Sequence, residues 1–526
     1  MKFLFSFNRQ DFYQSLQQFI NRPVQGWRAR TWAYVYGLFA ALALAPVYLL
    51  PCLILSCSGL LLLTHDTNSR QAFWLGWWFG FGYFTAGLYW IAFALGVDLA
   101  RFAWMIPFSV FGLPAILSFS VAPVLALTQK SGVKGVDRLI LFAALWTMFE
   151  WLRGHLLTGF PWNLISYSCI DFLYMAQSFS LFGAYGVSFF IVLWSGAFYL
   201  WPRYKAIMSV YSTFILVMFY GVMIIEPVST ENNVPNLILR IVQPSIPQKF
   251  KSSPHHAEQN LKKIIDLTNT PSQGPTPDVY LWPESATPFW LANDTVRRHS
   301  IMKLFDPARP LITGVTRFLR KKDVKLWNSL IAIDFQGKIM AHYDKSHLVP
   351  FGEYLPLRSL LSSYVQKITP GSIDYSAGLG LETLDIPNLP PFSPLICYEV
   401  IFPGKVKSLE SKIKPQWILN ITNDAWYGNT SGPYQHLAIA QARAIEEGLP
   451  LIRVGNNGIS AAIDPYGRIL KKLALNEVGV LDVALSKPRP TPTLYGQYGD
   501  KMLLLLLIFA IGVLLLRKFL NHFNRL

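Results

Sequence analysis

Residues 394–399 of this 526-residue chain read Pro-Leu-Ile-Cys-Tyr-Glu, an apolar strand that ends in a lone cysteine. A free cysteine is most often a small buried apolar residue, and a disulfide with Cys169 is a second ordinary explanation. The functional explanation is a nucleophile. A thiol with a pKa of about 8.5 is only a few per cent thiolate at neutral pH, so a nucleophilic Cys397 needs a neighbouring base or cation.

Two other segments offer such partners. Residues 281–286 (LWPESA) place Glu284 just after a short apolar strand, at the rim of a sheet, where functional sites collect. Residues 343–356 (YDKSHLVPFGEYLP) place Lys345 and Glu353 in one irregular loop. Taken singly, Glu284 is equally a capping or turn residue, and Lys345 is equally a solvated lysine. Together with Cys397 they form a candidate set of base, cation and nucleophile.

A fourth segment, residues 419–428 (LNITNDAWYG), indicates a polar, structured wall of a pocket. A zinc site at His347 and His436 is not favoured, because neither has a paired ligand at helical spacing. A serine hydrolase is not favoured either, because the chain has no G-x-S-x-G turn. The sequence therefore predicts neither a metal nor another cofactor.

Residues 234–486 combine short β-type runs with fewer helical patterns. Strands are predicted at 236–243, 279–282, 310–315, 326–334, 338–342, 395–397, 417–420, 450–454, 460–464 and 479–483. Helices are predicted at about 256–268, 293–305 and 433–447. Residues 385–394 hold four prolines and are interpreted as an irregular loop. Strands that are apolar throughout predict an α/β domain, with a sheet buried on at least one face and helices outside it.

The composition adds a membrane part to this domain. Apolar residues make up 52% and charged residues 14% of the chain, whereas an ordinary soluble domain has roughly 25% charged residues. These values exclude a disordered chain, a collagen-like chain and an ordinary cytosolic enzyme. Apolar runs predict seven membrane spans before the α/β domain and an eighth after it, at 31–46, 48–64, 72–95, 104–127, 138–152, 182–201, 207–226 and 502–516. A cleavable signal at 31–46 is less favoured, because the apolar pattern resumes at once.

The basic residues predict the orientation. The net charge of +16 could indicate nucleic acid or anionic lipid, but much of it flanks apolar runs, which favours a topological role and no nucleic-acid partner. With the N-terminus inside, the flanking basic residues fall on the cytoplasmic side, apart from Arg101 and Arg153: Lys2, Arg9, Arg22, Arg28, Arg30, Arg70, Lys130, Lys134, Arg138, Arg203, Lys205, Arg517, Lys518 and Arg525. The predicted division is a cytoplasmic segment 1–30, a seven-span domain 31–226, an extracytoplasmic domain 227–500, and a final helix with a cytoplasmic tail 501–526.

These segments together resemble the nitrilase superfamily. Because predicted membrane spans lie on both sides of the α/β domain, the chain is similar to the integral-membrane branch of that superfamily, the bacterial apolipoprotein N-acyltransferases. Residues 80–83 (GFGY), 160–163 (FPWN) and 185–189 (YGVSF) carry the resemblance into the membrane half. The likeness covers nearly the whole chain. It implies a polytopic α-helical membrane bundle plus an α/β nitrilase-like αββα sandwich domain.

The resemblance also implies roles for single residues. Glu284 matches the general base, Lys345 the transition-state cation, Cys397 the nucleophile, Glu353 a carboxylate that steadies the lysine, and Tyr398 and Glu399 the pair that follows the nucleophile and is needed for activity. The implied reaction transfers a phospholipid acyl chain, from sn-1 of phosphatidylethanolamine, through a thioester to the α-amine of diacylglyceryl-cysteine in an apolipoprotein. The implied partners are that phospholipid donor, that apolipoprotein acceptor and the bilayer. The implied setting is a monomer in a bacterial inner (cytoplasmic) membrane, with the catalytic domain in the periplasm.

One segment departs from the family pattern. The family usually has Gly and Asn where Pro244 and Ser245 stand, and a Trp soon afterwards, where residues 249–252 read KFKS. No site residue is assigned to this arm, Pro244–Ser252. Two other functions stay open: a membrane-tethered amidase, which a single anchor would serve, and a non-catalytic transporter or lipoprotein-binding protein, which would need intramembrane charges along a path.

Overall fold

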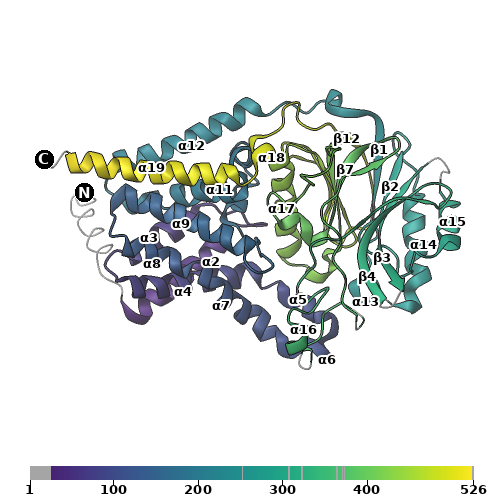
Figure 1. The fold of residues 1–526 in the computed structure, drawn as a ribbon, viewed down its shortest axis with the longest axis horizontal. Coiled ribbons are helices and arrows are strands. Elements are labelled where there is room, and N and C mark those ends of the chain that lie inside the picture. Colours follow the sequence, from purple (N-terminus) through teal and green to yellow (C-terminus); the bar gives the residue numbers. More distant parts are fainter. Residues whose placement is uncertain are drawn as a thin grey trace, which may run out of the picture.

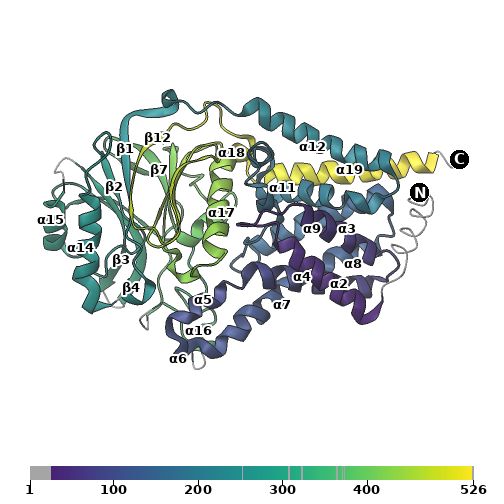
Figure 2. The same ribbon diagram turned by 180° about the vertical axis from the view of Figure 1, so that it is seen from behind.

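A computed structural model describes residues 25–251, 253–305, 309–320, 324–362, 365–369, 371 and 373–523. A helical bundle and a sandwich of two β-sheets lie end to end (Figure 1), and the view from behind shows the same arrangement (Figure 2). Most of the predicted segment 1–30, with Lys2, Arg9 and Arg22, lies outside the described residues, as do Ser252 and Arg525.

Helices occupy all the runs predicted to span the membrane. They are α2 (Gly26–Ala41), α3 (Pro51–Leu63), α4 (Ser69–Leu88), α5 (Ile91–Leu95), α7 (Leu113–Leu117), α8 (Ala122–Lys130), α9 (Gly135–His155), α11 (Phe179–Ser195), α12 (Tyr204–Ile224) and α19 (Lys501–Phe523). In the described part of the chain, four stretches are long and apolar enough to cross a membrane: Phe108–Lys130, Phe179–Leu200, Tyr204–Ile224 and Lys501–Leu520. The pair Ser69–Leu88 and Ile91–Met105, bent by 52°, would make a fifth.

The remaining helices of the bundle are shorter or more polar. The helix α3 has 13 residues, fewer than the roughly 20 that cross the hydrocarbon layer, and α9 carries Asp137, Arg138, Glu150 and Arg153. The count of eight spans and the division at residues 226 and 500 therefore stay predictions.

Two glycines let α2 and α4 cross at close range. A Cβ atom on Gly37 would lie 2.0 Å from the carbonyl oxygen of Phe79, and one on Gly82 would lie 2.2 Å from that of Tyr34. Small residues at helix crossings gain van der Waals contact where lipid gives helices no hydrophobic reason to associate. This crossing fixes α2, the first helix in the described part of the chain, against α4.

The sandwich has two six-stranded sheets, in the orders β12-β1-β2-β3-β4-β5 and β11-β10-β9-β8-β7-β6. The strands are β1 (Asn233–Gln243), β2 (Val279–Leu281), β3 (Leu311–Arg320), β4 (Val324–Ile333), β5 (Ile339–Asp344), β6 (Leu384–Ile386), β7 (Leu389–Ile396), β8 (Trp417–Thr422), β9 (Leu451–Gly455), β10 (Ser460–Ile463), β11 (Ile469–Leu473) and β12 (Gly479–Ser486). Strands β1, β2 and β3 run parallel, as do β7, β8 and β9. Parallel strands bring their carboxyl ends to one edge, and β2 and β7 carry Glu284 and Cys397 there.

Helices cover both outer faces. The helices α14 (Ala257–Thr268) and α15 (Thr295–Met302) share an apolar cluster with the first sheet, and the inner faces of the two sheets share another. The helix α17 (Gly432–Glu447) lies between the second sheet and the bundle (Figures 1 and 2), in one continuous core with both. The expectation of a helical membrane bundle with an αββα sandwich is confirmed.

The predicted loop at 385–394 is wrong, because β6 and β7 form a hairpin there. Proline is tolerated in a strand where no ladder hydrogen bond needs its missing N–H group. The edge strand β6 is three residues long and pairs with β7 only through Leu384↔Phe392 and Ile386↔Leu389. The strand β11 was also not predicted. All the predicted strands and all three predicted helices are present, with ends shifted by up to six residues.

The variant Gly82→Ala should destabilise the bundle by about 1–3 kcal/mol, the usual cost of overpacking, because its Cβ atom meets backbone rather than a movable side chain. Thermal unfolding in detergent micelles measures the change. The matched control is Gly512→Ala in α19, where an added Cβ atom meets nothing within 4 Å. Equal midpoints for the two variants would contradict the close crossing.

Candidate active site

Three strand ends deliver the predicted base, cation and nucleophile. Glu284 lies three residues beyond β2, Lys345 follows β5, and Cys397 follows β7. The backbone of Cys397 has φ 52°, in the left-handed region that costs a residue other than glycine about 1–3 kcal/mol and is often found at functional sites. Surrounding contacts must therefore hold this turn in place.

A chain of buried contacts joins Glu284 to Lys345. The Lys345 ammonium, only 1% exposed, lies 2.9 Å from Oε2 of Glu353. The side-chain amide of Asn328, in β4, donates to Oε1 of Glu284 at 2.7 Å and to Oε1 of Glu353 at 2.9 Å. The two carboxylates are thus held side by side by one amide. Sequence reasoning missed Asn328, because a single asparagine inside a strand carries no motif.

Each of these groups alters the proton affinity of the others. Burial and, to a smaller extent, the neighbouring Glu284 raise the pKa of the Cys397 thiol to about 12, although Lys345 opposes the rise. Burial also raises the pKa of Glu284, against the opposing effect of Lys345. For Lys345, burial alone would lower the pKa, but Glu353, Cys397 and Glu284 together hold it above its usual value. The site thus combines a protonated thiol, a cation and a carboxyl group with increased proton affinity.

Glu399 ties the loop that carries Lys345 to the turn at Cys397. Its Oε1 atom accepts hydrogen bonds from the Tyr343 hydroxyl (2.7 Å), the Ser346 N–H (2.7 Å) and the His347 N–H (3.1 Å). Its Oε2 atom accepts from the N–H of Ile396 at 2.8 Å. Glu399 therefore supports the site from within the fold. Tyr398 points elsewhere: its hydroxyl donates to the Gly159 carbonyl of the bundle at 3.3 Å.

The polar segment predicted as a pocket wall contributes a buried charged cluster. Asp424 pairs with Arg453 (2.6 Å) and with Nδ1 of His436 (3.0 Å). Burial favours the neutral acid, but Arg453 and His436 lower the pKa of Asp424 to about 2. Arg453 also donates to Oδ1 of Asn420 (2.5 Å), whose amide donates to the Leu395 carbonyl (3.3 Å). In the described part of the chain, no group of three or more His, Cys, Asp and Glu residues could hold a metal ion.

The bundle contacts this wall through two tryptophans. The Oε1 atom of Gln435, in α17, accepts from Nε1 of Trp162 (2.8 Å) and from Nε1 of Trp90 (3.1 Å); we call these three residues the indole anchor. Trp90 lies at the break between α4 and α5, with its ring 4.6 Å from that of Tyr427. The Trp162 ring lies 5.3 Å from that of His436. The membrane half therefore forms part of the wall beside the candidate catalytic residues.

The departing arm also reaches the site, through Lys251, which the sequence left without a role. Lys251 ends the short helix α13 (Gln248–Lys251) and is buried. Its Nζ atom donates to the backbone carbonyl of Glu284 at 2.8 Å. All four cysteines are free, so the alternative disulfide between Cys169 and Cys397 is excluded.

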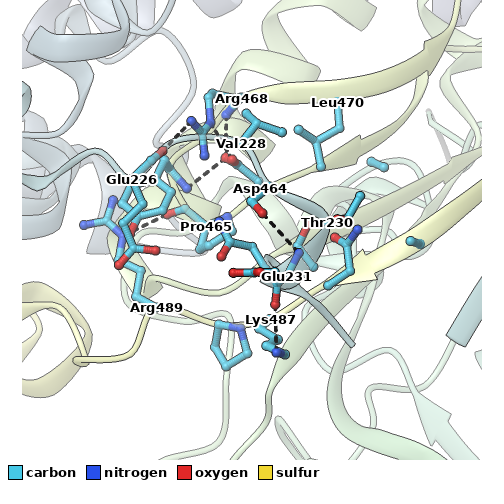
Figure 3. Close-up of a pocket in the computed structure, with 18 of the residues that line it drawn as sticks. Glu226, Val228, Thr230, Glu231, Asp464, Pro465, Arg468, Leu470, Lys487 and Arg489 are labelled. Atoms are coloured by element: carbon cyan, nitrogen blue, oxygen red, sulfur yellow. Dashed lines mark hydrogen bonds and ion pairs between the residues drawn. The ribbon is translucent and has the colours of Figure 1, made fainter. Parts of the chain in front are cut away.

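Figure 3 shows a cleft of about 440 Å³. It is lined by the start of β1 and the end of β12 and by none of the residues Glu284, Lys345, Glu353 and Cys397. Its walls are the connection 226–233 from α12 to β1, the turn between β10 and β11, and the segment 486–490 that follows β12. Arg468 pairs there with Asp464 at 2.5 Å and donates to the Glu226 carbonyl at 2.7 Å. The second of these contacts fixes the connection from α12 to β1. Lys487, in the segment after β12, donates from its backbone N–H to the Asn232 carbonyl at 2.7 Å and from Nζ to the Glu231 carbonyl at 2.8 Å, which joins the two connections.

Comparisons with known proteins agree with this arrangement. Residues 36–197 match the family model for the apolipoprotein N-acyltransferase N-terminal domain, and residues 239–492 match that for carbon-nitrogen hydrolases. An apolipoprotein N-acyltransferase of Rhodopseudomonas palustris is 37% identical over 519 residues, 94% of this chain and 96% of the relative. One of Rickettsia bellii is 38% identical over 497 residues, 92% of this chain and 97% of the relative.

Solved structures that the chain matches include a cysteine-to-alanine mutant of the Nesterenkonia AN1 amidase from the nitrilase superfamily. The TM-score is 0.37 at 20% identity, covering 52% of this chain and 96% of the amidase. The resemblance drawn from the sequence motifs is confirmed by the full-length relatives. A helical membrane half and a carbon-nitrogen hydrolase half, each matched in order along the chain, show that this protein belongs to the apolipoprotein N-acyltransferase family.

Proposed function

We propose that this protein N-acylates apolipoproteins by transferring an acyl chain from a phospholipid through a thioester on Cys397. The observation that carries the proposal is the buried set of Cys397, Glu284, Lys345 and Glu353, whose charges compensate one another. A cysteine nucleophile, a carboxylate base and a cation for the oxyanion are the parts that covalent acyl transfer requires.

In the first step, Glu284 accepts the thiol proton while Sγ of Cys397 attacks the ester carbonyl. A thiol with a pKa of about 12 stays protonated at neutral pH, so proton removal and attack must be coupled. Lys345 and a backbone N–H group next to Cys397 stabilise the oxyanion. The ester C–O bond then breaks, Glu284 returns the proton to the leaving alkoxide, and a lysophospholipid departs.

In the second step, the α-amine of the diacylglyceryl-cysteine attacks the thioester carbonyl. Glu284 accepts a proton from the amine, the C–S bond breaks, and Glu284 passes that proton to the leaving thiolate of Cys397. The product amide is more stable than the thioester, so the step runs downhill. Burial of the site limits hydrolysis of the thioester by water.

The membrane half suits two substrates that both carry acyl chains. The indole anchor holds α17 of the catalytic half against the bundle, which would place Cys397 near the headgroups rather than far out in water. We further propose sn-1 of phosphatidylethanolamine as the donor position, a monomeric enzyme, and a bacterial inner membrane with the sandwich on the periplasmic side. The flanking basic residues support that orientation.

The acyl-enzyme tests this function. Purified protein mixed with phosphatidylethanolamine vesicles should gain the mass of one acyl chain, and Cys397→Ala should gain none, because only this thiol lies beside Glu284 and Lys345 among the described residues. Mass spectrometry of the intact protein measures the adduct. Cys169→Ala, at a buried cysteine of the bundle, is the control and should acylate normally. An unacylated wild type that hydrolyses small amides would instead indicate an amidase.

The pH dependence of acyl-enzyme formation tests Glu284 as the base. Asn328→Asp replaces an amide that donates to Glu284 with a negative charge, which favours the protonated acid and raises the pKa of Glu284 further. Because the base must be ionised, the acid limb of the pH–rate profile should move up by about one unit or more. Asn293→Asp, at an exposed position, is the matched control. An unmoved acid limb in the Asn328 variant would count against Glu284 as the base.

A further inference from the structure

The arm whose sequence departs from the family pattern is firmly attached beside the site. The Asn456 side chain donates to the Ile246 carbonyl at 2.9 Å. The Gln248 side chain accepts from the Asn423 amide at 2.7 Å. The start of α13 is thus fixed to the loop after β8. The end of α13, at Lys251, is directed by this attachment toward the turn after β2.

Lys251 packs against the main chain of Glu284. Its side chain is 6% exposed, and its ammonium donates to the Glu284 carbonyl at 2.8 Å. On another side, a Cβ atom on Gly314 would lie 2.6 Å from Cα of Glu284. The next residue, Ser285, has φ 45°. Glu284 therefore sits in a strained turn that close contacts hold in place. The contact made by Lys251 is the one that brings a charge.

The surrounding charges suit an ammonium at this position. Burial lowers the pKa of Lys251 to about 8, against the opposing effects of Glu284 and Cys397. In return, Lys251 lowers the pKa of Glu284, as Lys345 does, while Glu353 raises it. An amine buried without anionic neighbours would shift its pKa further and lose its charge. Lys251 is instead cationic through the acidic and neutral range.

We propose that Lys251 is a positioning residue of the acyl-transfer site, which fixes the Glu284 turn and helps to keep the Glu284 carboxylate ionised for proton removal. This inference rests on the proposed function, in which Glu284 is the general base. It gives the arm Pro244–Ser252 a role within the reaction. The arm places a second cation beside the general base, whereas Lys345 stabilises the oxyanion.

Two substitutions separate the charge from the hydrogen bond. Lys251→Met removes both, and Lys251→Gln keeps an amide that can donate to the Glu284 carbonyl but has no charge. Acyl-enzyme formation on phosphatidylethanolamine vesicles is followed against pH by mass spectrometry. We expect the acid limb to move up by about one unit in both variants, with a rate at pH 5–6 reduced roughly tenfold and a smaller loss above pH 7.

Lys249→Met is the matched control, because Lys249 is exposed on the same short helix and should leave the profile unchanged. Circular dichroism and thermal unfolding confirm that each variant folds. A Lys251→Gln profile that coincides with wild type would overturn the proposal, and so would a uniform loss of rate with an unmoved acid limb in both variants. An absent acyl-enzyme in wild type would instead count against the proposed function itself.

Discussion

The need to compensate charges that are buried together governs this structure. An ionised group taken out of water costs several kcal/mol unless a partner of opposite charge and further hydrogen bonds offset the cost. Lys345 has Glu353 at 2.9 Å, and the amide of Asn328 separates Glu353 from Glu284. These groups come from β4, from the end of β2 and from the loop that follows β5, so the register of the first sheet contributes to the charge balance of the site. A slip by one residue would turn the Asn328 side chain to the other face.

The second sheet positions Cys397, the proposed nucleophile, under a different constraint. Cys397 adopts a backbone conformation that is unfavourable in isolation, and its neighbours hold it there. Glu399 accepts hydrogen bonds from the backbone N–H of Ser346, in the Lys345 loop, and from that of Ile396, at the end of β7, and so joins the two segments. Asn420 reaches the Leu395 carbonyl, with Arg453 and Asp424 behind it. The helix α17 carries both Gln435 and His436. Because the bundle holds Gln435 through two indole N–H groups, it also supports the cluster of His436, Asp424 and Arg453 behind the Cys397 turn.

Much of the fold and of the site could be predicted from the sequence. Glu284, Lys345 and Cys397 each stand in a segment whose turn residues or strand end can be recognised locally, and the structure brings them together. Asn328 and Lys251 could not be found in this way, because their importance depends on which strands become neighbours. The hairpin of β6 and β7 was missed for a related reason. Prolines indicate a loop unless it is known which backbone positions of a strand make no hydrogen bond to the neighbouring strand. Helices with buried polar groups, such as α9, likewise make the number of spans hard to count from hydropathy.

The chain path adds one more consequence. The sandwich leaves the bundle after α12 and returns to it before α19, and Asp500, at that return, accepts hydrogen bonds from Trp151 (2.7 Å) and Tyr495 (2.8 Å). A domain on one stalk can swivel about it, but a domain tethered at two separate points has lost that rotation. Both connections line the cleft in Figure 3, so the two tethers lie next to each other there. The Cys397 thiol therefore keeps a fixed position and orientation relative to the bundle, so that any group bound in the bundle would meet it from one constant direction.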